Sequence, residues 1–75
     1  MNYSCDLEPG DKLTVLEFAY DEENPELKIL ACERKCTVIR EYRYFILVDY
    51  GADRESINKA NLICEDVKIV KGWKE

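Results

Sequence analysis

Histidine is absent from the 75 residues of this chain. The chain therefore lacks the side chain that ordinarily titrates near neutral pH and that most often binds transition metals. Only three glycines are present, and none belongs to a glycine-rich loop of the kind that cradles phosphate groups. Because no catalytic constellation is recognisable, we expect a protein that is not an enzyme and that needs no cofactor.

Long hydrophobic runs are also missing, since no apolar stretch approaches the ~18 residues that a membrane helix requires. The first residues, MNYSCDLEPGDK, contain neither a basic start nor an apolar segment, so we expect no secretory signal, no membrane association and a cytoplasmic protein. Apolar residues make up 47% of the chain, which is enough for folding, and the length predicts a single domain over residues 1–75.

The net charge of −5 is unevenly distributed. Residues 1–27 carry eight acidic side chains and one basic one, whereas residues 28–45 carry five basic side chains and two acidic ones. The acidic total argues against general affinity for nucleic acid, which requires lysine and arginine to neutralise phosphates. We interpret the run Asp21-Glu22-Glu23 as a solvated loop tip, and its alternative as an acidic surface that meets a basic partner.

Short runs of β-branched and aromatic residues, separated by turn signals, predict an all-β domain. The surest strand is Tyr44 to Tyr50, in which both alternating faces are largely apolar. The other expected strands are 13–20, 27–42, 54–57 and 67–70, and the first two would form a long hairpin.

The pattern of this hairpin predicts one irregularity and leaves one alternative open. The apolar phase slips by one residue between Val15 and Leu16, which predicts a β-bulge or bend there. In the second strand, Asn24-Pro25-Glu26 is typical of a helix N-terminus, so residues 25–35 have a helical alternative to the strand.

Between the last two strands, residues 58–62 predict one turn of 3-10 helix, with Asn58 as its cap and Leu62 inserted into the core. Five strands, a long N-terminal hairpin and a 3-10 turn before the last strand describe a small SH3-like five-stranded barrel. Closure of the sheet would also protect its edges.

Three segments of the chain carry a resemblance: Cys36 to Tyr42, the run Phe45 to Val48, and Arg54 to Asn58 followed by Leu62. They resemble a group of small uncharacterised bacterial proteins, many carried by phages and other mobile elements, with the signature "VI…Y…F…LV…RESxN…L". The resemblance covers about two-thirds of the chain. It implies an SH3-like fold and implies no activity.

The four cysteines, Cys5, Cys32, Cys36 and Cys64, include one close pair with C-x₃-C spacing. Zinc sites usually show C-x₂-C pairs, and on a straight strand Cys32 and Cys36 would be about 13 Å apart. We therefore expect no metal site, and we interpret the four thiols as small buried side chains.

Arginine and tyrosine residues gather in and after the basic segment, and this mixture often anchors protein partners. We expect a protein-interaction surface formed by Arg40, Tyr42, Arg43, Tyr44, Tyr50 and Arg54. The leading hypothesis is a non-enzymatic interaction module, monomeric or weakly homodimeric, that binds a protein partner. The alternative is a nucleic-acid-binding barrel of the SH3 or KOW type that uses the basic 28–45 segment. Trp73 is expected to anchor the C-terminal tail.

Overall fold

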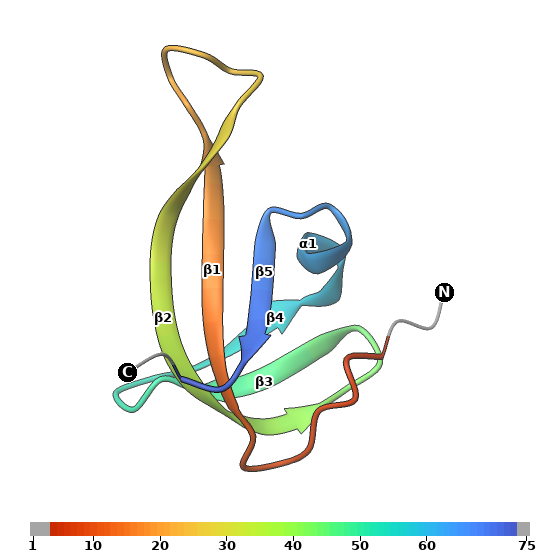
Figure 1. Ribbon diagram of the computed structural model, residues 1–75. Helices are drawn as coiled ribbons and strands as arrows, with labels where there is room; N and C mark the ends of the chain where they lie inside the picture. The colour runs from red at the N-terminus through yellow and green to blue at the C-terminus, as the bar shows by residue number, and fades with distance from the viewer. Residues whose placement is uncertain (1–3, 74–75) are drawn as a thin grey trace.

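A computed structural model of the chain describes residues 4–73. It contains one antiparallel sheet of five strands and one short helix (Figure 1). The all-β prediction is therefore confirmed. The elements are β1 (Lys12–Tyr20), β2 (Lys28–Glu41), β3 (Phe45–Asp49), β4 (Arg54–Asn58), α1 (Lys59–Ile63) and β5 (Val67–Lys71).

The strands lie in the order β4-β3-β2-β1-β5, so each strand up to β4 pairs with the next one in the chain, and β5 returns to pair with β1. The sheet is not closed, because β4 and β5 remain its two edges. The predicted closed barrel is thus not what the strand pairing shows. The Arg34 side chain of β2 nevertheless reaches β4, where it donates to Glu55 Oε2 at 2.9 Å.

The core lies on the inner face of the bent sheet. Alternation places Leu13 and Val15 of β1 on this face, opposite Cys36 and Arg34 of β2. Ile46 and Val48 of β3 are fully buried against them, and α1 adds one leucine. Each fully buried aliphatic side chain contributes about 1.5–3 kcal/mol of hydrophobic stabilisation. The complete buried apolar set is Leu7, Leu13, Val15, Cys36, Val38, Ile46, Val48, Ile57 and Leu62.

The helical alternative for residues 25–35 is wrong. Residues Lys28–Cys32 pair with Glu17–Tyr20 of β1, so tertiary pairing outweighs the local helix-start signal. The bulge is real but lies elsewhere than predicted: Glu17 pairs with Cys32 and Phe18 with Leu30, which leaves Ala31 as the extra residue on β2. β1 itself is regular at the predicted position, where Val15 and Leu16 pair with Arg34 and Glu33 of β2 and with Ile69 and Lys68 of β5.

The β1–β2 hairpin projects from the rest of the molecule (Figure 1). β5 pairs with β1 only from Leu13 to Glu17, and β3 pairs with β2 only from Thr37 to Glu41. Residues 18–31 therefore form a two-stranded ribbon with the acidic turn at its tip. We call this ribbon the arm.

The predicted 3-10 turn is a short α-helix, because Cys64 N–H donates to the Ala60 carbonyl four residues earlier at 3.0 Å. The predicted cap is confirmed: Asn58 Oδ1 accepts from Ala60 N–H at 2.9 Å. Leu62 is buried, as expected. The helix ends with Glu65 in the left-handed conformation (φ 63°), followed by a hydrogen bond from Asp66 N–H to the Asn61 carbonyl.

The C-terminal segment crosses the outer face of the sheet. Trp73 Nε1–H donates to the Cys36 carbonyl at 3.0 Å, and Thr14 Oγ1 donates to the Gly72 carbonyl at 2.9 Å. The tail is thereby tied across β1 to β2, which agrees with the anchoring role expected for Trp73 and accounts for the burial of Thr14.

Candidate functional site

Four of the six predicted binding residues gather at the turn between β2 and β3. Arg40 lies near the end of β2, and Tyr42, Arg43 and Tyr44 form the turn, which is closed by a hydrogen bond from Tyr42 N–H to the Phe45 carbonyl at 2.8 Å. Phe45 joins them. We call these five residues, Arg40, Tyr42, Arg43, Tyr44 and Phe45, the aromatic–arginine surface.

Two rings of this surface stack on each other, and the third lies under an arginine side chain. The ring centroids of Tyr42 and Phe45 lie 4.6 Å apart with an interplanar angle of 20°, which is a stacked pair. Arg40 lies over the Tyr42 ring at 5.2 Å and Arg43 over the Tyr44 ring at 5.3 Å. Tyr44 remains 64% exposed, and Tyr42 and Phe45 are each 38% exposed. The aromatic rings are thus held in place and still accessible.

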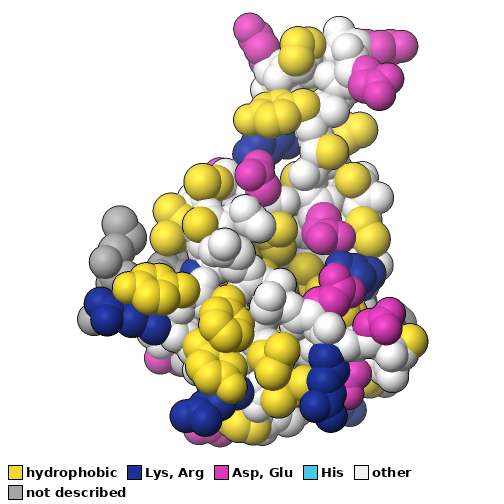
Figure 2. Space-filling view, turned by 180° about the vertical axis from the view of Figure 1, so that it is seen from behind, with side chains coloured by type: hydrophobic (Ala, Val, Ile, Leu, Met, Phe, Trp, Pro, Cys, Tyr) yellow, Lys and Arg dark blue, Asp and Glu magenta, His cyan; other side chains and the backbone are white. Residues whose placement is uncertain are grey.

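One face of the molecule shows the resulting distribution of side chains (Figure 2). Hydrophobic groups gather on the body of this face, and lysine and arginine lie at its margins. Acidic groups lie at the tip of the arm and also along one side of the body, next to lysine and arginine groups.

The other two predicted residues, Tyr50 and Arg54, lie at the opposite end of β3. Tyr50 N–H donates to the Asp53 carbonyl at 2.9 Å in the turn before β4, and Arg54 begins β4. β3 has five residues, so the two groups are about 13 Å apart along the strand. The structure does not bring all six predicted residues into one surface.

Tyr50 belongs instead to a cluster around Arg34. The guanidinium carbon of Arg34 lies 4.1 Å from the centre of the Tyr50 ring, and Arg34 also contacts Glu17 at 3.6 Å and Glu55 at 2.9 Å. Burial raises the pKa of Tyr50 to about 12, although Arg34 opposes this shift. This cluster connects three strands, and its contacts give Tyr50 a structural role.

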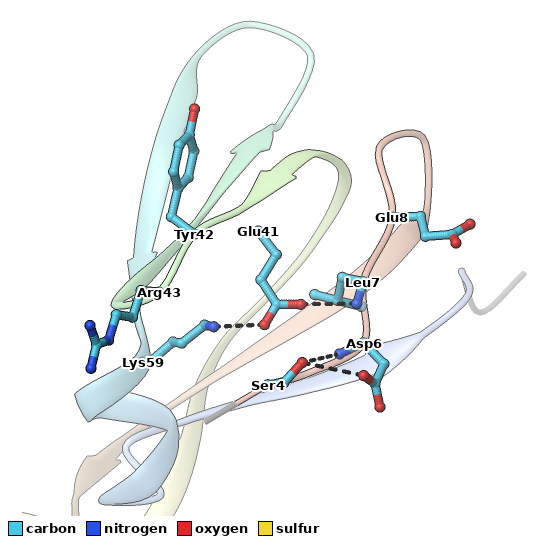
Figure 3. Close-up of a pocket in the computed structure, with 8 residues that line it drawn as sticks. All are labelled: Ser4, Asp6, Leu7, Glu8, Glu41, Tyr42, Arg43 and Lys59. Carbon is cyan, nitrogen blue, oxygen red and sulfur yellow. Dashed lines mark hydrogen bonds and ion pairs between the residues drawn. The ribbon is translucent and has the colours of Figure 1, made fainter. Parts of the chain in front are cut away.

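An open cleft of about 530 Å³ adjoins the aromatic–arginine surface, between the N-terminal segment and the end of β2 (Figure 3). At its floor the Glu41 carboxylate is reached by Lys59 from one side and by the Leu7 amide from the other, while Tyr42 points away. The cleft is lined by Ser4, Asp6, Leu7, Glu8, Glu41, Tyr42, Arg43 and Lys59.

Glu41 is held ionised by its neighbours. Burial alone would raise the pKa of this carboxyl group, but a side-chain hydrogen bond from Lys59 and backbone hydrogen bonds from Cys5 and Leu7 outweigh it and leave the pKa below its usual value. Each carboxylate oxygen already has a partner, at 2.6 Å for Lys59, 2.8 Å for Cys5 N–H and 2.9 Å for Leu7 N–H. These contacts give the Glu41 carboxylate a structural role in the cleft.

The interpretation of all four cysteines as buried side chains is wrong for Cys64, which is exposed. Cys36 is buried in the core, and Cys5 and Cys32 are partly buried. Cys32 and Cys36 do share one face of β2, opposite Glu17 and Leu13 of β1. Within residues 4–73 no group of three or more histidine, cysteine, aspartate or glutamate side chains is arranged to hold a metal ion.

Sequence reasoning missed Phe45 as a surface residue and missed the Glu41–Lys59 pair. Phe45 belonged to the expected core strand, and only its place beside the turn, with Tyr42 three residues earlier, indicates that a stacked pair could form there. Glu41 and Lys59 are eighteen residues apart, and nothing in the local pattern connects them.

No family model, curated protein or solved structure matches this chain. In the part of the chain that the structure describes, no helix has the length and apolar character needed to cross a membrane.

Proposed function

We propose that this chain is a non-enzymatic protein-interaction module of the SH3-like type that binds a protein partner through its aromatic–arginine surface. The fold assignment is supported by the strand order, in which β1 pairs with both β2 and β5, and by the single helical turn placed before the last strand. The resemblance to phage and mobile-element proteins makes a protein of the bacterial host a reasonable partner.

One observation carries the binding proposal: within a single turn, Tyr44 is 64% exposed and the stacked Tyr42–Phe45 pair is itself open to solvent. Aromatic rings held rigidly lose little conformational entropy on binding, and tyrosine and arginine dominate the energetic centres of protein interfaces. Arg40 and Arg43 lie over two of the rings and add donors for a partner's carboxylates or carbonyls.

The alternative of nucleic-acid binding has less support in the basic 28–45 segment. Lys28 lies 2.7 Å from Asp66, and Arg34 contacts both Glu17 and Glu55. Two of the five cations in this segment are therefore already paired with carboxylates and are less able to neutralise phosphates.

An affinity experiment with lysate of the bacterial host tests the proposal. We expect immobilised protein to capture a specific partner, and we expect the variant Tyr42→Ala/Tyr44→Ala to lose it. Lys68→Ala, an exposed substitution on the outer strand β5, is the matched control and should retain the partner. Equal capture by the wild type and the double variant would contradict the proposed surface. Retention on heparin or single-stranded DNA with a steep salt dependence would favour the nucleic-acid alternative.

A further inference from the structure

The first nine residues of β2 pair with β1 on one side only, so their other side forms an open edge of the sheet. β2 runs from Lys28 to Glu41, but β3 begins to pair with it only at Thr37. Within residues 4–73, no strand lies along the other side of residues 28–36 (Figure 1). This edge is longer than any of β3, β4 and β5, each of which has five residues.

The direction of the backbone groups follows from the pairing with β1. Val38 exchanges hydrogen bonds with the β1 side, since its N–H donates to the Asp11 carbonyl and its carbonyl accepts from Gly10 N–H. Backbone groups alternate in direction along an antiparallel strand, so those of Lys35 and Glu33 are directed away from β1. A further strand can bond to these outward groups without disturbing the hairpin.

Several large apolar side chains near this edge are exposed to solvent. Ile29 and Leu30 are each 50% exposed, and Tyr20 on the neighbouring strand is 61% exposed. Two-stranded ribbons are only marginally stable in water, and exposed edges with apolar side chains tend to pair with another chain. An added strand would cover these side chains.

Charge indicates the chemistry of the segment that fits. Residues 17–36, which include the whole edge, carry six acidic side chains and three basic ones, Lys28, Arg34 and Lys35. Lys28 is already bonded to Asp66 at 2.7 Å, and Arg34 is bonded to Glu55 at 2.9 Å and contacts Glu17 at 3.6 Å. An incoming acidic segment would be repelled along this length, whereas a basic one would be attracted.

A hollow of about 140 Å³ lies beside the edge on the outer face of the sheet. Leu16, Val70 and Trp73 line it together with Glu33 of the edge strand. Because side chains of an added strand alternate between the two faces, every second one would be directed to the side of the sheet where this hollow lies.

We propose that the outer edge of β2, residues 28–36, accepts an extended, lysine- or arginine-rich segment of a partner protein as an additional β-strand. Backbone hydrogen bonds would supply affinity, and the acidic surroundings would select basic segments. This edge shares no residue with the aromatic–arginine surface, so each of the two proposals can be tested without the other.

The test uses the isotopically labelled chain and a blocked peptide of alternating lysine and valine, about nine residues long so that it spans the edge. We expect saturable chemical-shift changes centred on residues 28–36 and at least tenfold slower exchange of the Glu33 and Lys35 amide protons. Glu33→Pro removes an outward donor without removing a bond to β1, and it should abolish these effects.

Two peptide controls separate strand addition from simple charge attraction. A glutamate–valine peptide of the same length should not bind, and a lysine–valine peptide N-methylated at alternate residues should bind at least tenfold more weakly. Equal binding of the methylated peptide, shifts centred on β4 or β5, or no binding at all would each overturn the proposal. Sedimentation showing that the free chain dimerises through this edge, with the dimer lost in Glu33→Pro, would assign the edge to a second copy and would also overturn it.

Discussion

Lys59 Nζ lies 2.6 Å from Glu41 Oε2, and the two side chains are only 6% and 10% exposed. The same carboxylate accepts backbone hydrogen bonds from Cys5 and Leu7. One buried charge thus joins the N-terminal segment, the end of β2 and the start of α1. Because Glu41 and Lys59 both line the cleft next to the aromatic–arginine surface, the pair links the walls of that cleft.

Removing the carboxylate should be strongly destabilising. Glu41→Gln removes the carboxylate that lies 2.6 Å from the buried Lys59 ammonium, and breaking a buried pair in this way costs about 3–5 kcal/mol. Urea unfolding followed by circular dichroism measures the change. In the double variant Glu41→Gln/Lys59→Met both charges of the pair are absent, and most of the loss should be recovered.

Asp66→Asn is the matched control, because the Lys28–Asp66 pair lies at the surface, with side chains 27% and 48% exposed. Surface pairs of this kind contribute little, and the midpoint of urea unfolding should stay within experimental error. A Glu41→Gln midpoint as close to wild type as that of Asp66→Asn would contradict the role assigned to the buried pair.

The depressed pKa of Glu41 predicts a pH dependence with a definite sign. Burial raises this pKa, but the hydrogen bonds from Lys59, Cys5 and Leu7 lower it by more. A group whose pKa is lower in the folded state adds stability that is present above its unfolded value, about 4.3 for glutamate, and is lost as the pH falls through the folded value.

Urea unfolding at neutral pH and at a series of acidic pH values measures this effect. We expect stability to fall below about pH 4.3 and the slope to be shallower in Glu41→Gln, which has no carboxyl group at this position. Amide exchange at Cys5 and Leu7 should accelerate over the same range. Identical slopes in wild type and variant would assign the acid sensitivity to other carboxylates.

Strands and caps were predictable from this sequence because their signals are local. The alternation from Tyr44 to Tyr50 contains β3, the turn at Gly51 precedes β4, and Asn58 before Leu62 marks the helix start. Each depends on residues within a few positions of one another. The same locality explains the misplaced bulge, since the slip between Val15 and Leu16 cannot show on which strand of the hairpin the extra residue lies.

Local patterns could not predict whether the sheet closes or which of the predicted residues share one surface. Whether β4 and β5 pair depends on how strongly β2 bends, which is a property of the whole sheet. Tyr42 and Tyr50 look equivalent in sequence, yet one lies at the exposed turn and the other lies against Arg34 in a cluster of three strands. The structure therefore brings the predicted residues at the turn together and places Tyr50 and Arg54 elsewhere.

The helix cap offers a smaller and cleaner test of local structure. Asn58 Oδ1 accepts from Ala60 N–H at 2.9 Å, so Asn58→Ala should lower the free energy of unfolding by about 1 kcal/mol. Asn61→Ala on the same helix is the control, because its backbone carbonyl, which accepts from Asp66, is kept. Equal losses in the two variants would show that helix propensity, and not the cap, determines the effect.

Thiol reactivity should separate the exposed cysteine from the core cysteine. Burial raises the pKa of Cys36 to about 11, so about one molecule in a thousand carries its thiolate at pH 8. Cys36 is also only 1% exposed, whereas Cys64 is open to solvent. With a disulfide reagent at pH 8, we expect Cys64 to react first and Cys36 to react last, at a rate limited by opening of the core.

The fast phase should vanish in Cys64→Ser, and all four thiols should react together in urea. Modification of Cys36 as fast as that of Cys64 in the native protein would mean that the inner face of β2 is not packed as the structure describes.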